Sequence, residues 1–404
     1  MSILLRLGLR QFSQTIFLGT GFCCLAVASA YAQQAPVPPT QQPSTTYVAM
    51  QGSEQWMYDS NPLKLLQNYK SLNGYNTSGV LILNSDSQAW NLDTNSEVDN
   101  GSFQNPKFDS TDFHEKTNAS IKNDVWKAGL GGQFDYDTTR TSEITTYGIT
   151  FPSVRHTGES LSPEIDFNPD TVEKLAVKGT LSRSTYDNTA FTNYNFDTIN
   201  PTYSYIFDPL NTGLFTMNYQ RYSTINGIPT TVNTYGPSLG WIRVVNPNMT
   251  FKVTAGAEDS EQNATAGAPA SSSLNYVFSG DMSIKALNDT FTFDATRSQQ
   301  PFGNGSSALF TSFKAADTHA INERLSLNAS GTYRFAQYLE NSTTSINLNR
   351  EYDGTAGVTY RIYTNLDFIA NYQYTNQTLT NINGAVKEQT VMVGLSFHPI
   401  AGAL

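Results

Sequence analysis

The sequence predicts an all-β protein, a transmembrane antiparallel β-barrel of about 18 strands (16–18) that follows a cleaved signal peptide. Three observations support this fold class. The composition is that of a large β protein, apolar and polar residues alternate with a period of two, and short turns alternate with longer polar loops. Downstream of the signal, no apolar stretch is long enough to form a membrane helix.

The composition limits the class of protein. Charged residues make up 14 % of the 404 residues, against about 25 % in an ordinary soluble domain. The 22 Tyr and 23 Phe favour strands and argue against disorder. A net charge of −10, without a cluster of Lys and Arg, excludes a nucleic-acid binder. Both cysteines, Cys23 and Cys24, precede residue 33, so the processed chain has no disulfide and no thiolate site.

The first 32 residues have the features of a secretory signal peptide. Arg6 and Arg10 precede a mostly apolar stretch over residues 16–30, and Ala30-Tyr31-Ala32 is a small-x-small cleavage site. The apolar stretch is too short to span the ~30 Å hydrocarbon layer comfortably, so removal is favoured over anchoring. We therefore predict cleavage after Ala32.

The rest of the chain divides into three predicted parts. Residues 33–45 contain four prolines among Gln, Ser and Thr, which predicts an extended periplasmic spacer. The barrel is expected over residues 46–399, and residues 400–404 form a short C-terminal tail.

Alternation with a period of two runs through the predicted barrel. In residues 366–375, Leu366, Phe368, Ala370 and Tyr372 alternate with more polar residues and so lie on one face of a strand. Short turns rich in Asn, Asp and Pro are expected at 84–86, 123–124, 168–170, 208–211, 246–248, 288–289, 322–323 and 364–365. Longer loops are expected near 61–74, 101–107, 141–152, 187–193, 226–232, 262–271, 300–306, 341–346 and 381–386. Only the run 307–322 alternates poorly.

A membrane barrel explains both faces of these strands better than a secreted sandwich or β-helix does. The apolar face mixes Gly and Ala with Leu, Val and Phe, and aromatic residues lie near the strand ends, as at a lipid interface. A β-helix would show a fixed short repeat, and the sequence has none. Closure is expected because an open sheet edge in lipid would leave backbone groups unpaired.

A barrel of this size implies a water-filled lumen, because only barrels near eight strands are filled by side chains. No inserted loop is long enough to fold deeply into it, and the longest candidate, near 61–74, carries Lys64 and Lys70. The predicted lumen-lining charges share the polar parity of their strands: Lys127, Asp135, Asp137, Lys178, Lys252, Glu258, Asp281, Lys285, Asp294, Arg334, Asp353 and Arg361. Both signs occur, so a strongly ion-selective ring is not expected. The alternative is that these charges only hydrate the wall and pair with one another across strands.

The sequence predicts no enzyme, no catalytic residue, no cofactor and no metal site. The nearest arrangement to a nucleophile and base is His156 with Ser160 or Ser162, which lacks a hydrolase motif. Asp109, Asp112 and Glu115 could offer oxygen ligands to Ca²⁺, but they lack a defined loop motif.

Two segments resemble the family called putative β-barrel porin 2. These are Met57-Tyr58-Asp59-Ser60-Asn61-Pro62-Leu63 and the closing run Val391-Met392-Val393-Gly394-Leu395-Ser396-Phe397-His398-Pro399. The resemblance extends over roughly residues 46–399 and implies a channel or an export-associated role, without catalytic residues. Many outer-membrane barrels end on an aromatic residue, whereas here Phe397 is followed by seven more residues.

We therefore predict a porin-like channel in a Gram-negative outer membrane, through which small hydrophilic solutes diffuse passively. Its expected partners are outer-membrane lipid, the solutes or a polysaccharide, and the outer-membrane assembly machinery. One alternative is a barrel associated with export or anchoring of a surface polysaccharide. Another is a non-conducting structural or adhesin barrel. The sequence leaves the oligomeric state and the solute open.

Overall fold

The structure is a computed structural model, and it describes residues 45–67, 69–139, 154–189, 191–227, 229–263, 270–301, 307–338, 348–380, 384–398 and 402–403. The predicted signal peptide and all but the last residue of the predicted spacer lie outside these residues. In the described part of the chain, no helix is long and apolar enough to cross a membrane.

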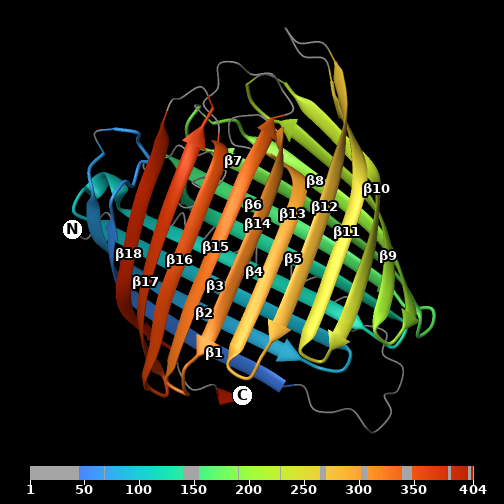
Figure 1. Cartoon of the computed structure of the whole chain (residues 1–404), viewed down its shortest axis with the longest axis horizontal. Coiled ribbons are helices and arrows are strands. Elements are labelled where there is room, and N and C mark those ends of the chain that lie inside the picture. The colour runs from blue at the N-terminus through green and yellow to red at the C-terminus, as the bar shows by residue number, and fades with distance from the viewer. Residues whose placement is uncertain are drawn as a thin grey trace, which may run out of the picture. The chain divides into compact units, whose positions relative to one another are not determined.

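In the described residues, nineteen strands make up one antiparallel sheet (Figure 1). Their bounds are β1 Thr45–Asp59, β2 Leu72–Asp86, β3 Trp90–Phe103, β4 Ser110–Lys122, β5 Trp126–Thr138, β6 Arg155–Phe167, β7 Glu173–Tyr186, β8 Tyr194–Asp208, β9 Asn211–Thr224, β10 Thr231–Asn246, β11 Met249–Gln262, β12 Ser271–Lys285, β13 Asp289–Pro301, β14 Ser307–Ala320, β15 Leu325–Tyr338, β16 Leu348–Tyr363, β17 Leu366–Leu379, β18 Ala385–Phe397 and β19 Gly402–Ala403.

Eighteen of these strands close into a barrel, as the sequence predicts. Each strand from β1 to β18 pairs with its neighbours in the chain, and β1 also pairs with β18, from Gly52↔Phe397 to Asp59↔Thr390. The two-residue β19 pairs with Tyr47 and Val48, on the part of β1 that β18 leaves free. Gly402 and Ala403, which follow β18 in the chain, therefore add to the closure of the sheet.

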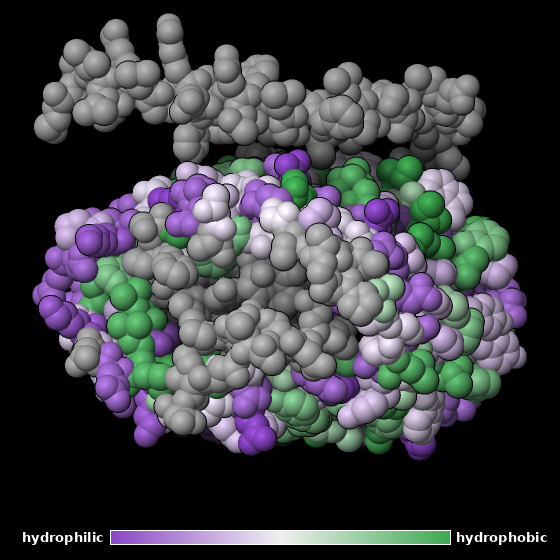
Figure 2. Space-filling view, turned by 90° about the horizontal axis from the view of Figure 1, so that it is seen from above, coloured by the Kyte–Doolittle hydropathy of each residue, from purple (hydrophilic) through white to green (hydrophobic). Residues whose placement is uncertain are grey.

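Apolar side chains mark the outer face of the wall. On β5, Trp126, Leu130 and Tyr136 are 39–41 % exposed, whereas Lys127 and Asp135 point to the opposite face. The same parity holds from strand to strand, because the register shifts only near the ends of the pairs β8–β9, β10–β11 and β16–β17. We call the face opposite the exposed apolar residues the inner face. From above, hydrophobic and hydrophilic residues intermingle along the described parts of the rim (Figure 2).

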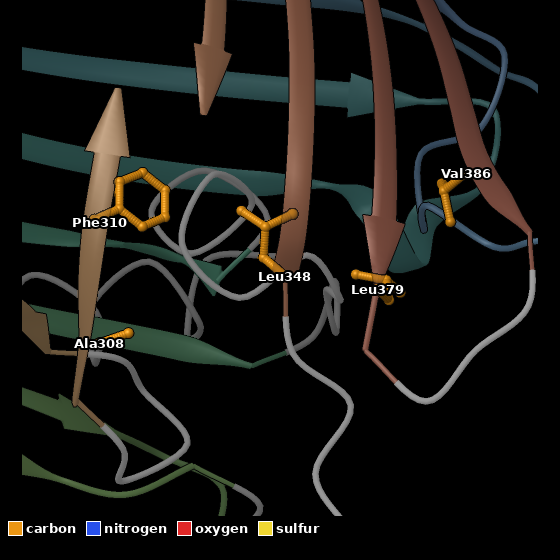
Figure 3. Close-up of a cluster of buried hydrophobic side chains, with 5 residues drawn as sticks. All are labelled: Ala308, Phe310, Leu348, Leu379 and Val386. Carbon is orange, nitrogen blue, oxygen red and sulfur yellow. The ribbon is translucent and has the colours of Figure 1, made fainter. Parts of the chain in front are cut away.

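Buried hydrophobic clusters form at one end of the barrel, where the longer loops lie. The largest contains Phe310, Leu348, Leu379 and Val386 together with Ala308, from four strands (Figure 3). A second combines Leu72, Phe103 and Phe108, of which Phe108 belongs to a 3₁₀ helix, Pro106–Phe108. The third combines Val154, Tyr186 and Phe191. In each cluster, inner-face residues meet a loop or strand end that turns inward. We call the end of the barrel that carries these clusters the long-loop end, and the opposite end the short-turn end.

The wall overlaps itself between β12 and β13. These strands pair only from Phe278↔Arg297 to Lys285↔Thr290, so residues 271–277 of β12 pair with no described residue of β13. Gln299 of β13 instead accepts hydrogen bonds from Thr234 of β10 and from Ser260 of β11 (3.1 Å). Thr234 and Ser260 lie on the inner face, so the end of β13 lies inside the ends of β10–β12. We call this overlap the lap.

The lap and the largest hydrophobic cluster explain the weak alternation at the start of β14. All of residues 307–311 are buried, because one face of the strand meets the cluster and the other faces the lap. A strand covered on both faces has no need to alternate.

Candidate functional site

All twelve predicted lumen residues lie on the inner face by register. Their contact with a solute stays a prediction. The wall does not gather them into one cluster, but distributes them among several small networks on different strands. Those networks decide which charges are already neutralised by a neighbour and which are not.

Lysines surround carboxylates on β5–β7. Glu164 of β6 accepts ion pairs from Lys127 Nζ (3.3 Å) and Lys178 Nζ (3.5 Å), and Lys174 Nζ lies 2.6 Å from Asp166 Oδ2. The lysine side chains are 39–62 % exposed, so the inner face is open to water here. Glu164 was not among the predicted lumen residues, although the outward parity of Ile165 and Phe167 could have identified it.

Two histidines occupy the inner face near the long-loop end of β4–β6. His114 Nδ1 lies 2.8 Å from Asp135 Oδ1, and His156 Nδ1 lies 3.0 Å from Asp137 Oδ1. The His156 ring also contacts Tyr186, with centroids 5.1 Å apart. In the described structure no hydrogen bond joins His156 to Ser160 or Ser162. The two predicted carboxylates therefore have histidine partners that the sequence pattern did not reveal.

A buried polar network crosses β15–β17. Arg334 Nη1 donates to Glu351 Oε1 (2.8 Å), and the Glu351 carboxylate also accepts a hydrogen bond from Gln377. Asp353 Oδ2 accepts hydrogen bonds from Gln373 (2.6 Å) and Thr375 (2.9 Å). Glu351, at 1 % exposure, is satisfied in this way, as a buried charge must be.

The remaining predicted lumen residues differ in whether a neighbouring side chain bonds to their charged group. Glu258 accepts a hydrogen bond from Asn218 (3.0 Å), and Arg361 Nε lies 3.8 Å from Asp367. Within the described residues, four others make no ion pair: Lys252, Asp281, Lys285 and Asp294. Lys252 lies opposite Asp281 in the ladder, and Asp281 lies opposite Asp294. These four are the charges most available to a passing ion.

The signs are distributed unevenly along the barrel. Most of the predicted cations lie in the half of their strands near the short turns: Lys127, Lys178, Lys252, Lys285 and Arg361. Four predicted carboxylates lie in the half near the longer loops: Asp135, Asp137, Glu258 and Asp353. Asp281, Asp294 and Arg334 are the exceptions. The inner face is therefore more acidic toward the long-loop end.

No group of three or more His, Cys, Asp and Glu suited to a metal ion occurs among the described residues. Asp112, one of the three acids that could have offered oxygen ligands to Ca²⁺, pairs with Arg155 Nη1 at 2.9 Å.

The family model described as "Putative beta-barrel porin 2" matches residues 253–398 of the chain. This match includes all but the last residue of the closing run that carries the resemblance seen in the sequence, and it confirms that resemblance for the C-terminal part. No curated protein matches the chain in sequence.

Several solved structures are similar to this barrel. Pseudomonas aeruginosa OccK11 (OpdR) is 10 % identical with a TM-score of 0.44, covering 88 % of this chain and 96 % of that one. P. aeruginosa OpdK with vanillate is 10 % identical with a TM-score of 0.48, covering 89 % and 99 %. The FrpB iron transporter from Neisseria meningitidis (F5-1 variant) is 9 % identical with a TM-score of 0.49, covering 84 % and 64 %. At these identities the likeness concerns the fold alone.

Proposed function

We propose that this protein is an outer-membrane channel that lets small hydrophilic solutes diffuse passively through a polar lumen. One observation carries the proposal: a closed barrel of eighteen strands has charged side chains on its inner face that remain open to water. Barrels of 16–18 strands enclose an aqueous channel, whereas those near eight strands are filled by their own side chains. The family match to a porin model supports the same function.

Transport of this kind needs no cofactor and no chemical step. The twelve inner-face charges would keep the wall hydrated and offer a passing solute transient hydrogen bonds and ion contacts. Because half of them have an ion-pair partner, they would bind solutes weakly and release them quickly. Weak binding at several sites is what conduction requires.

Single-channel recording of the purified protein in a planar lipid bilayer tests the proposal. We expect stable stepwise conductance that scales with bulk salt. The protein must first be shown to be folded by its heat-modifiable mobility on gels. Folded protein that gives no conductance steps would contradict the channel.

A non-conducting barrel is the second candidate, and the inward-turning loops at the long-loop end favour it. Phe108 and Phe191 both pack against inner-face residues and so narrow that opening. Absence of conductance would make this candidate, or a barrel linked to a surface polysaccharide, the better account.

We further propose the route by which the chain reaches the membrane. Cleavage after Ala32 would release residues 33–45 as a periplasmic spacer, and the outer-membrane assembly machinery would insert the barrel. N-terminal sequencing of protein extracted from outer membranes would identify the cleavage site. A mature chain that still began at Met1 would contradict this route.

A further inference from the structure

We propose that residues 60–67, which we call the strap, form a size-limiting constriction on the inner face, and that Asn61 and Lys64 hold it in place. This inference rests on the proposed channel function, because it concerns the same lumen. The strap follows β1 directly and begins at the seam where β1 and β18 close the barrel.

The strap continues the pairing of β1 with β18 beyond the end of β1, where hydrogen bonds from the Asn61 side chain replace backbone hydrogen bonds. β1 pairs with β18 as far as Asp59, and Ser60 N donates to Gln389 O (2.9 Å). The chain then turns, and Asn61 Nδ2 donates to Lys387 O (3.0 Å). The same Asn61 side chain closes the turn, because Nδ2 donates to Leu65 O (2.8 Å) and Oδ1 accepts from Leu65 N (2.9 Å). Asn61 is 0 % exposed, so these bonds are shielded from water.

Lys64 fixes the strap to the inner face of β18. Its Nζ lies 3.4 Å from Glu388 Oε2, and the two side chains are only 4 % and 9 % exposed. Lys64 has a φ of 48°, a left-handed conformation that is uncommon for a residue other than glycine. Such a conformation persists only where the surrounding contacts hold it. A buried ion pair adds little net stability, but losing one partner is costly, so the pair holds the strap in one position.

Apolar contacts extend on both sides of this attachment. Leu63 packs against the cluster that contains Leu72 and Phe103, on β2 and β3. Leu66 packs against the cluster that contains Leu348 and Val386, on β16 and β18. In Figure 3 the blue chain segment passes close to Val386. The strap therefore runs along the inside of the wall, across the closure seam.

The position of the strap determines what it would do. A segment attached to the inner face reduces the open cross-section at the long-loop end, where a solute from outside would enter. The charge of Lys64 is matched by Glu388, so the strap would select solutes by size more than by charge.

Substitution of Lys64 tests this role in conductance. We expect Lys64→Ala to release the strap, to raise single-channel conductance and to admit larger sugars in liposome-swelling assays. Lys70→Ala is the matched control, because it removes the same charge from the same loop. Lys70 is exposed and makes no ion pair with a described residue. The exchange Lys64→Glu with Glu388→Lys should restore the wild-type values. If Lys64→Ala behaves like Lys70→Ala, the strap is not the constriction.

A second measurement does not require the channel to conduct, and it uses more than one variant of the strap. In a chain with Cys23→Ser and Cys24→Ser, a cysteine at Val386, which is 2 % exposed, should react slowly with a membrane-impermeant maleimide. Adding Asn61→Ala or Lys64→Ala should speed the reaction, whereas Lys107→Cys, at an exposed position of the 3₁₀ helix, should react quickly in every background. Fast labelling of Val386→Cys with the strap intact would overturn the proposal. A wild-type protein that does not conduct would overturn the channel function, while this labelling would still decide whether the strap covers the wall.

Discussion

Arg297 shows how one residue can join two parts of the wall where strand pairing stops. Its Nε donates to Tyr276 O (3.1 Å), Nη1 to Thr311 Oγ1 (2.9 Å) and Nη2 to Gln337 Oε1 (2.8 Å). The guanidinium also lies 4.3 Å from the centroid of the Tyr276 ring. The Tyr276 carbonyl lies on the part of β12 that β13 leaves unpaired, so Arg297 satisfies an acceptor that the ladder does not.

Arg297→Met should therefore destabilise the barrel. The change keeps an apolar stem of similar length but leaves three acceptors without their donor, in a residue that is 4 % exposed. We expect a loss of about 2–4 kcal/mol in the free energy of unfolding. The measurement is the urea concentration at which the band of folded, heat-modifiable protein disappears from the gel. Arg243→Met is the control, because the exposed Arg243 stacks on Trp241 at 5.7 Å, and it should have little effect. Equal midpoints for the two variants would contradict the role of Arg297.

At the scale of elements, close strand contact decides where glycine is required. On the inner face of β18, a Cβ at Gly394 would lie 2.1 Å from Glu54 O and 2.6 Å from Gln55 Cα, across the closure seam with β1. On the outer face of β16, a Cβ at Gly354 would meet nothing within 4 Å. The sequence pattern presents both as glycines within alternating strands, yet only one of them is needed for the pairing of β1 and β18.

We expect Gly394→Ala to weaken closure by about 1–3 kcal/mol, the usual cost of adding a methyl group to a site without room for it. Gly354→Ala should be neutral or slightly stabilising, because alanine lowers the entropy of the unfolded chain. Urea titration of the folded gel form compares the two variants directly. If Gly354→Ala were the more destabilising of the pair, the seam would not be the site of tight packing.

The whole molecule combines a net charge of −10 with an inner face that is more acidic toward the long-loop end. Fixed carboxylates near an opening raise the local concentration of cations. The exposed lysines of β5–β7 at the other half oppose this preference. A modest cation preference is therefore expected for the channel.

Replacing Lys127 and Lys178 with Gln should increase this cation preference, because Glu164 then loses both of its partners. The reversal potential under a salt gradient across a planar bilayer measures the change. Lys70→Gln, in an exposed loop, should leave the reversal potential nearly unchanged. A double variant whose reversal potential is as unchanged as that of Lys70→Gln would show that these lysines do not face the conducting path.

A local period of two and the turn chemistry were enough to predict about 18 strands, a closed antiparallel barrel and the parity of the twelve charges. Which charges pair depends on the folded barrel, because Glu164 meets Lys127 and Lys178 across strands whose register no single segment specifies. The lap and the strap are likewise visible only in the tertiary structure. Gln299 meets Thr234, and Lys64 meets Glu388, over separations of 65 residues and more, at points where the ladder ends and local pattern no longer dictates the partner.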